Sequence, residues 1–209
     1  MTVTISARQA ATASVLLWVF LITPPLRTAL ESSMLLHMLV QLPTLFLIGF
    51  ALGWAWRQVP PQSITGRALS TLIRANRWGM TGLIAAAFTM TLWMLPRLLD
   101  SARLDFGFDV AKFLTVSLLG GLAVSVSWRA TPAILRAVIH LEVVATLLRF
   151  GWGYLASEER LCLVYLVGDQ QRTGGALLVL GAIYALIVVW RPLFGGLGIK
   201  SAGNSRPAV

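Results

Sequence analysis

The stretch from Ser33 to Trp56, SMLLHMLVQLPTLFLIGFALGWAW, decides the fold of this chain. It contains no charged residue and is longer than the roughly 20 residues that a helix needs to cross a bilayer core. The whole chain has 209 residues, of which 57% are hydrophobic and only 12% charged, unlike a typical soluble domain. The sequence therefore predicts a membrane protein of the all-α class.

Other stretches are also long and apolar enough to cross a bilayer: Ala10 to Leu26, Trp78 to Leu98, Val110 to Trp128, Pro132 to Leu155 and Gly174 to Phe194. Together they predict a polytopic bundle of about six transmembrane helices. The first stretch also resembles a signal peptide, because Arg8 precedes its short apolar centre and Pro24 and Pro25 follow that centre. Because no small-x-small cleavage site follows, we interpret it as a helix. Residues 1–200 should form one transmembrane domain, and 201–209 a disordered tail.

Charge predicts the orientation of this bundle. If the N-terminus is cytoplasmic, the inner loops and ends hold no acidic residue but many basic ones: Arg8, Arg57, Arg67, Arg74, Arg77, Arg129, Arg136, Arg191, Lys200 and Arg206. Apart from Glu142, the acidic residues then fall in the outer loops, beside a similar number of basic residues: Glu31, Asp100, Asp105, Asp109, Glu158, Glu159 and Asp169. By the positive-inside rule, both termini should be cytoplasmic. We expect a multi-pass protein of the bacterial inner membrane. Its net charge of +9 follows from topology and gives no reason to expect nucleic-acid binding.

Soft metal-ligand side chains recur at helical spacing in the second stretch. Met34, His37, Met38 and Gln41 are three, four and seven residues apart, so a helix places them on one stripe. Thioether sulfur and neutral imidazole suit Cu(I), whereas Mg²⁺ and Ca²⁺ prefer clustered carboxylates. The alternative interpretation is structural: the methionines fill gaps between helices while His37 and Gln41 bond neighbouring helices.

Three further groups could take part in such a site. Met90 and Met94, four residues apart on the third stretch, reach a comparable depth and complete a thioether-rich site or simply pack in the core. Cys162 is the only cysteine, so it forms no internal disulfide; it is either apolar filler or a further copper ligand. On the fifth stretch, Glu142 and Arg149 should be too far apart for an easy ion pair, with Arg149 reaching for the interface.

Two segments resemble the CtaG family of caa3-type cytochrome c oxidase assembly factors. MLLHMLVQLPTLFLIGFALG (Met34 to Gly53) is similar to the family's HM-x-x-HM segment, and GDQQRTGGALLVL (Gly168 to Leu180) to its DQQ-x-x-G segment. The resemblance implies copper-site roles for His37 and Met38, and supporting roles for a second set: Asp169, Gln170 and Gln171. The family has two histidines where this chain has one, with Ser33 or Gln41 in place of the other.

A third stretch has a weaker resemblance to the copper-resistance CopD family. LDFGFDVAKFLTVSLLGGLAVSV and the later ATPAILRAVIHLE are similar to that family's FG-x-x-x-x-K segment and its glutamate-bearing helix. The resemblance would make Phe106, Gly107, Lys112 and Glu142 the shared positions.

The leading hypothesis is a membrane protein that holds Cu(I) near the periplasmic face and delivers it to a cytochrome oxidase subunit or another copper enzyme. Its metal ligands would be Met34, His37, Met38, Gln41, Met90 and Met94. The alternative is a non-catalytic accessory subunit of a larger respiratory or monooxygenase complex. An enzyme is not expected, because the sequence has no nucleophile–base pair, HExxH motif or phosphate loop.

Overall fold

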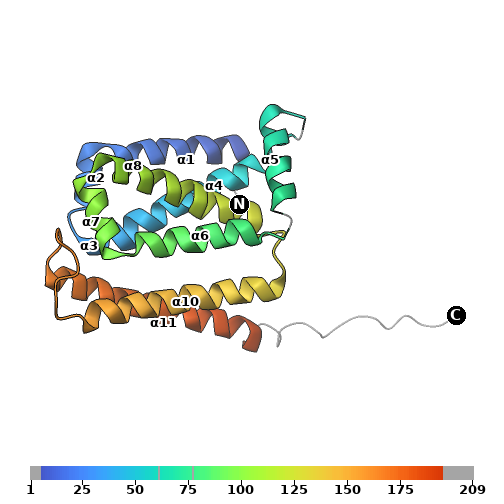
Figure 1. The fold of residues 1–209 in the computed structure, drawn as a ribbon. Helices are drawn as coiled ribbons and strands as arrows, with labels where there is room; N and C mark the ends of the chain where they lie inside the picture. Colours follow the sequence, from blue (N-terminus) through green and yellow to red (C-terminus); the bar gives the residue numbers. More distant parts are fainter. Residues whose placement is uncertain (1–5, 61, 77, 195–209) are drawn as a thin grey trace, which may run out of the picture.

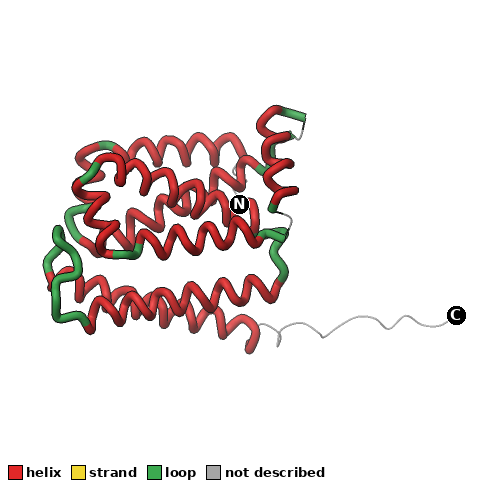
Figure 2. Tube along the Cα trace, in the orientation of Figure 1, coloured by secondary structure: helices red, strands yellow, loops and turns green. Residues whose placement is uncertain are grey.

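In a computed structural model, the chain folds into helices joined by short turns (Figure 1). The structure describes residues 6–60, 62–76 and 78–194, and backbone alone for 191–194. No strand occurs in these ranges, which confirms the all-α prediction (Figure 2). The predicted tail at 201–209 lies outside them.

The chain runs back and forth between two ends of the molecule, which we call the loop end and the α5 end (Figure 1). Its passes along this direction are α1 (Ala7–Ile22); α3, η1 and α4 (Met34–Leu36, His37–Gln41 and Leu42–Trp56); α6 (Met80–Trp93); α8, η2 and α9 (Phe106–Thr115, Val116–Leu122 and Ala123–Ser127); α10 (Ala133–Ala156); and α11 (Val167–Phe194). The loop end carries α2 (Pro24–Leu30), α7 (Pro96–Leu104) and segment 157–166. The other end carries α5 (Ile64–Ala75).

Within the described residues, three helices are long and apolar enough to cross a membrane: Met34–Trp56, Phe106–Ser127 and Val167–Trp190. Two bent pairs, α1 with α2 and α6 with α7, raise the number to five if each pair is one span. The structure thus supports a membrane protein with three to five candidate spans, and the six spans expected from the sequence stay a prediction. The remaining pass, α10, has 24 residues but carries Arg136, Glu142 and Arg149, which lower its hydropathy.

Proline positions account for the two sharp bends. The chain turns by 78° between α1 and α2 and by 75° between α6 and α7. In each case an extended residue, Thr23 or Leu95, precedes a proline at the first turn of the next helix. Proline disfavours the helical conformation in the residue before it, so a helix ends there and the next one starts in a new direction.

Small residues bring the central helices into close contact. A side-chain carbon added at Gly49 of α4 would lie 1.8 Å from the carbonyl oxygen of Ser117 in η2, and one at Gly121 would lie 1.9 Å from that of Phe46. Non-bonded atoms cannot come this close, so only glycine at these positions lets α4 and η2 approach each other to this distance. Small residues have the same role between packed transmembrane helices.

α10 and α11 form an antiparallel hairpin beside a bundle made of α1, α4, α6 and the α8–η2–α9 helix (Figure 1). Gly151 and Gly174 bring the two helices of the hairpin together, since a side-chain carbon at Gly174 would lie 2.8 Å from the Gly151 carbonyl oxygen. The hairpin meets the bundle mainly at the loop end. This arrangement leaves space between α6 and α10, described below.

Candidate functional site

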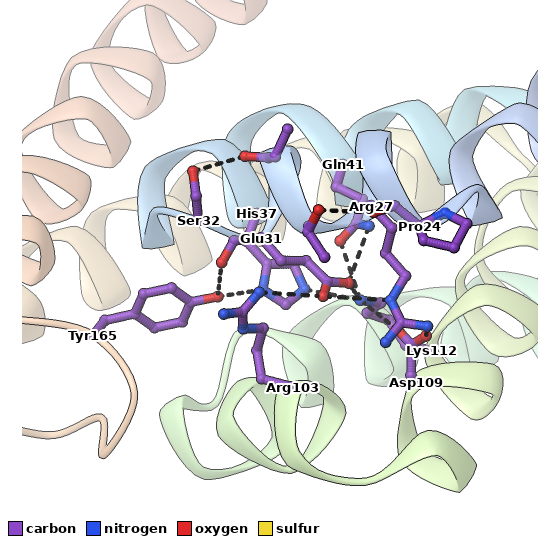
Figure 3. A network of polar contacts seen from close by, with 12 residues as sticks. Pro24, Arg27, Glu31, Ser32, His37, Gln41, Arg103, Asp109, Lys112 and Tyr165 are labelled. Carbon is purple, nitrogen blue, oxygen red and sulfur yellow. Dashed lines mark hydrogen bonds and ion pairs between the residues drawn. The ribbon is translucent and has the colours of Figure 1, made fainter.

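A cluster of charged side chains is buried at the loop end of the bundle (Figure 3). Lys112 of α8 is at its centre and has no solvent exposure. Its ammonium group lies 2.7 Å from Glu31 Oε1 and 2.9 Å from Asp109 Oδ1. It also donates hydrogen bonds to Gln41 Oε1 at 3.1 Å and to His37 Nε2 at 3.0 Å. A buried ammonium is stable only with such partners.

Two arginines surround the same carboxylates from the surface. Arg27 of α2 lies 2.9 Å from Asp109 Oδ2 and 3.7 Å from Glu31 Oε2. Arg103 of α7 lies 3.7 Å from Glu31 Oε2. Three cationic side chains therefore face two carboxylates, and the cluster has one excess positive charge. We call Arg27, Glu31, His37, Gln41, Arg103, Asp109, Lys112 and Tyr165 the charge cluster.

His37 has a defined proton arrangement within the charge cluster. Because the Lys112 ammonium can only donate, His37 Nε2 must accept, and the ring proton is then on Nδ1. Nδ1 donates to the Tyr165 hydroxyl at 2.8 Å, and that hydroxyl donates to the Glu31 backbone carbonyl at 3.2 Å. Burial raises the pKa of the Tyr165 phenol, so the hydroxyl stays protonated and keeps donating. His37 is thus neutral and bonded at both nitrogens.

This arrangement does not fit the predicted Cu(I) site. A copper ion binds imidazole through a free nitrogen lone pair, and His37 has none, since Nε2 accepts from Lys112. The Lys112 ammonium, 3.0 Å from the ring nitrogen, would also repel a metal cation. Among the described residues, no group of three or more histidine, cysteine, aspartate or glutamate side chains is placed to hold a metal ion.

The predicted methionine ligands all pack against apolar neighbours. Met34 and Met38 are buried in the hydrophobic core, and Met90 and Met94 are partly buried against it. Met90 and Met94 also line the cavity described below. Cys162 is buried in the same core. The structural interpretation of these residues therefore describes their surroundings better than the ligand interpretation.

Two of the three residues in the DQQ segment anchor the start of α11, one to the bundle and one within the hairpin. The Asp169 carboxylate accepts a hydrogen bond from the backbone N–H of Met34, at the start of α3. Gln170 is buried, accepts from the backbone N–H of Leu161 at 3.0 Å and donates to the Tyr154 carbonyl at 3.3 Å. Gln171 is exposed on α11 and lies outside the charge cluster. Asp169 and Gln170 thus anchor helices.

Sequence reasoning missed several members of the charge cluster. Glu31 and Asp109 were assigned to outer loops, yet both are buried. Asp100, also assigned to a loop, is buried and accepts backbone hydrogen bonds from Leu163 at 2.6 Å and Val164 at 3.3 Å. The available signal was Lys112, whose charge within an apolar stretch requires a buried anionic partner.

A second polar feature lies on α10, apart from the charge cluster. Glu142 and Arg149 form an ion pair at 2.9 Å, with 52% and 66% of their side chains exposed. The expectation that this pair would be stretched is wrong, because the long arginine side chain spans two helical turns. Thr146, between them, donates to Glu142 at 3.2 Å. His140, on the same helix, bonds Tyr184 of α11 at 2.6 Å.

The ion pair borders a lateral groove between α6 and α10. One cavity of about 580 Å³ is lined by apolar residues of α4, α6 and α10, including Phe46, Leu83 and Val143, and reaches Glu142. A second cavity of about 510 Å³ continues along Thr146 and Arg149. The two share Thr91, Glu142 and Thr146, so we treat them as one groove. Pockets of this size that are mainly apolar, with few polar groups, are typical binding sites.

Comparison with known proteins identifies no relative. No family model matches the sequence, and neither the curated proteins nor the solved structures contain a match. The charge cluster and the lateral groove therefore carry the functional inference by themselves.

Proposed function

We propose that this chain is a non-catalytic accessory subunit of a larger complex in the bacterial inner membrane. In this proposal it crosses the bilayer six times with both termini in the cytoplasm, and the lateral groove receives a transmembrane helix of the partner protein. The observation that carries the proposal is the exposed Glu142–Arg149 ion pair on the wall of an apolar groove.

The depth of the ion pair makes its exposure costly. α11 is a candidate membrane span, and α10 lies along it (Figure 1). Glu142 is near the middle of α10, so it would lie close to the bilayer centre. Charged side chains at that depth almost always face other helices or a wet cavity, because contact with lipid tails leaves them unsolvated. The groove therefore requires a polar occupant.

A partner helix fits this requirement better than a lipid tail. Arg149 donates one hydrogen bond to Glu142 and one, through Nε, to the Ala145 carbonyl at 3.2 Å. Guanidinium has five N–H donors, so it can also bind polar side chains of a neighbouring helix. Interhelical hydrogen bonds of this kind hold transmembrane helices together. The apolar floor of the groove supplies the van der Waals contact.

Copper handling, which the resemblance to the CtaG family implies, remains a prediction. It has less support here because His37 is bonded at both ring nitrogens. The accessory role requires no metal, and its test does not depend on the charge cluster.

Site-specific photocrosslinking in native membranes tests the proposal. A photoreactive amino acid at Val143 lies in the groove, and one at Leu186 of α11 serves as the control, because Leu186 is 65% exposed but does not line the groove. We expect Val143, but not Leu186, to crosslink to a transmembrane peptide of one other protein, identified by mass spectrometry. The double variant Glu142→Gln, Arg149→Gln should form less of that crosslink.

Other outcomes would overturn the proposal. Crosslinks to lipid alone would mean that the groove is a lipid site, and crosslinks to a second copy of this chain would indicate self-association. Equal crosslinking from Val143 and Leu186 would mean that the groove has no specific occupant.

A further inference from the structure

Helix α5 differs from the other long helices in direction and in composition. It runs across the direction of the bundle helices, at the end opposite the charge cluster (Figure 1). Ser63 caps its N-terminus by accepting from the backbone N–H of Gly66 at 3.0 Å. If the bundle helices cross the bilayer, α5 lies in the plane of the membrane surface.

The α5 helix has two exposed faces of opposite character. Ile64, Ala68 and Leu72 recur at intervals of four on one face, and all three are exposed, Ile64 by 78%. Arg67 and Arg74, seven residues apart, lie roughly 110° around the helix from that face and are also exposed. Gly66 and Leu69 are buried against the rest of the protein. A helix with this pattern is typical of those that lie in a membrane interface.

The charged residues on α5 are all basic. No acidic residue occurs between Glu31 and Asp100, and within the described part of the chain neither Arg67 nor Arg74 forms an ion pair. An exposed arginine pair without counterions favours anions, and arginine side chains bind phosphate with two parallel hydrogen bonds.

Tryptophans place this helix at the depth of lipid headgroups. Trp54 and Trp56 end α4 directly before α5, and Trp78 precedes α6. Trp56 also fixes α5 by donating from Nε1 to the Thr65 carbonyl at 3.0 Å. Tryptophan is enriched at membrane–water interfaces, so its presence at both junctions marks this end of the bundle as interfacial.

We infer that α5 is an interfacial helix that binds anionic phospholipid, with its apolar face among the acyl chains and Arg67 and Arg74 against the phosphate groups. This inference is independent of the proposed partner at the lateral groove, which lies on α6 and α10.

The depth of α5 can be measured on the full-length protein in vesicles. Spin labels are attached at Leu72→Cys or, as the matched control on the polar side, at Ser70→Cys, each in a Cys162→Ala background. We expect the label at position 72 to collide more with oxygen, which concentrates among acyl chains, and the label at 70 more with a water-soluble nickel complex. A label at position 72 that is more accessible to the nickel complex, or shielded from both reagents, would overturn the inference.

Lipid specificity needs a second measurement. A fluorophore is attached at Ser70→Cys, and its quenching is measured in vesicles that contain phosphatidylglycerol with a quencher on the headgroup. The same measurement is made with phosphatidylcholine that carries the same quencher. We expect several-fold stronger quenching by phosphatidylglycerol, and loss of this preference in the Arg67→Gln, Arg74→Gln variant. Arg97→Gln, an exposed arginine of α7 at the opposite end, is the control and should retain the preference. Equal quenching by both lipids, or a preference unchanged in the double variant, would overturn the inference.

Discussion

Replacing Lys112 by methionine tests whether the charge cluster holds the loop end together. Methionine keeps most of the side-chain volume but removes the charge that lies 2.7 Å from Glu31 and 2.9 Å from Asp109. Both carboxylates are buried, and Arg27 and Arg103 compensate them only in part. Removing one partner of a buried ion pair typically costs about 3–5 kcal/mol, because the other charge is left without compensation.

This loss should be visible in thermal unfolding of the detergent-solubilised protein. For a chain of this length, roughly 2–4 °C in Tm correspond to each kcal/mol, so we expect Lys112→Met to lower Tm by roughly 6–20 °C. Arg97→Met is the control, since it removes an exposed cation and should change stability by no more than about 0.5 kcal/mol.

A double-mutant cycle separates the ion pair from general disruption. Glu31→Gln removes the carboxylate that Lys112 compensates, so combining both substitutions should cost about 0.5–3 kcal/mol less than the sum of the single effects. Two results would refute the reasoning: a loss below about 1 kcal/mol for Lys112→Met alone, or full additivity in the cycle.

Three shorter predictions follow from other contacts. Because both His37 nitrogens are bonded, Cu(I) titration under reducing conditions should give no stoichiometric binding and no difference for His37→Ala; one bound ion that the variant loses would instead support copper handling. Burial raises the pKa of the Cys162 thiol to about 12, so N-ethylmaleimide should label it slowly until a denaturant unfolds the chain. Since the unfolded thiol, with a pKa near 9, loses its proton first, this residue should lower stability as pH rises above about 9, and a Cys162→Ala variant should lose that component. Gly121→Ala forces an atom to within 1.9 Å of the Phe46 carbonyl and should cost at least about 1–3 kcal/mol in thermal unfolding; Gly153→Ala, with nothing within 4 Å of the new atom, should cost nothing.

Hydropathy predicted the helices, because long apolar stretches leave few alternatives to a transmembrane helix. Within Ser33 to Trp56 and Val110 to Trp128 the predicted helices agree with α3–η1–α4 and α8–η2–α9 to within a few residues. The late helix was placed too short, since α11 starts at Val167 rather than at Gly174. Its first turn contains Asp169 and Gln170, whose polar side chains lowered the local hydropathy although they are used to anchor the hairpin.

Only part of the charge cluster could be predicted from the sequence. The spacing of Met34, His37, Met38 and Gln41 correctly placed them on one helix, and all four are buried. Their partners could not be predicted, because spacing does not reveal what faces a stripe. Lys112 comes from a helix about 75 residues later in the chain and reaches His37 only because η2 and α4 pack closely through their small residues.

The lateral groove could not be predicted from the sequence for a similar reason. Hydropathy identifies apolar surface on α6 and α10 but does not tell whether those surfaces meet each other. The α10–α11 hairpin joins the bundle through contacts concentrated at the loop end, where Tyr165 bonds His37 and Asp169 bonds the backbone of Met34. These contacts fix one end of the hairpin and leave the remainder free to stand away from α6, so the groove depends on where the polar anchors lie.

The position of those anchors connects the charge cluster to the proposed partner site. An ion pair buried at a helix interface contributes little net stability, but it strongly disfavours any arrangement that separates its members. Tyr165 and His37 link the hairpin to the same network as Lys112 and Glu31. A shift of segment 157–166 away from η1 would therefore break these hydrogen bonds. The charge cluster thus fixes the loop end of the lateral groove, which Pro96 and Leu161 line, so that this part of the proposed partner site is preformed.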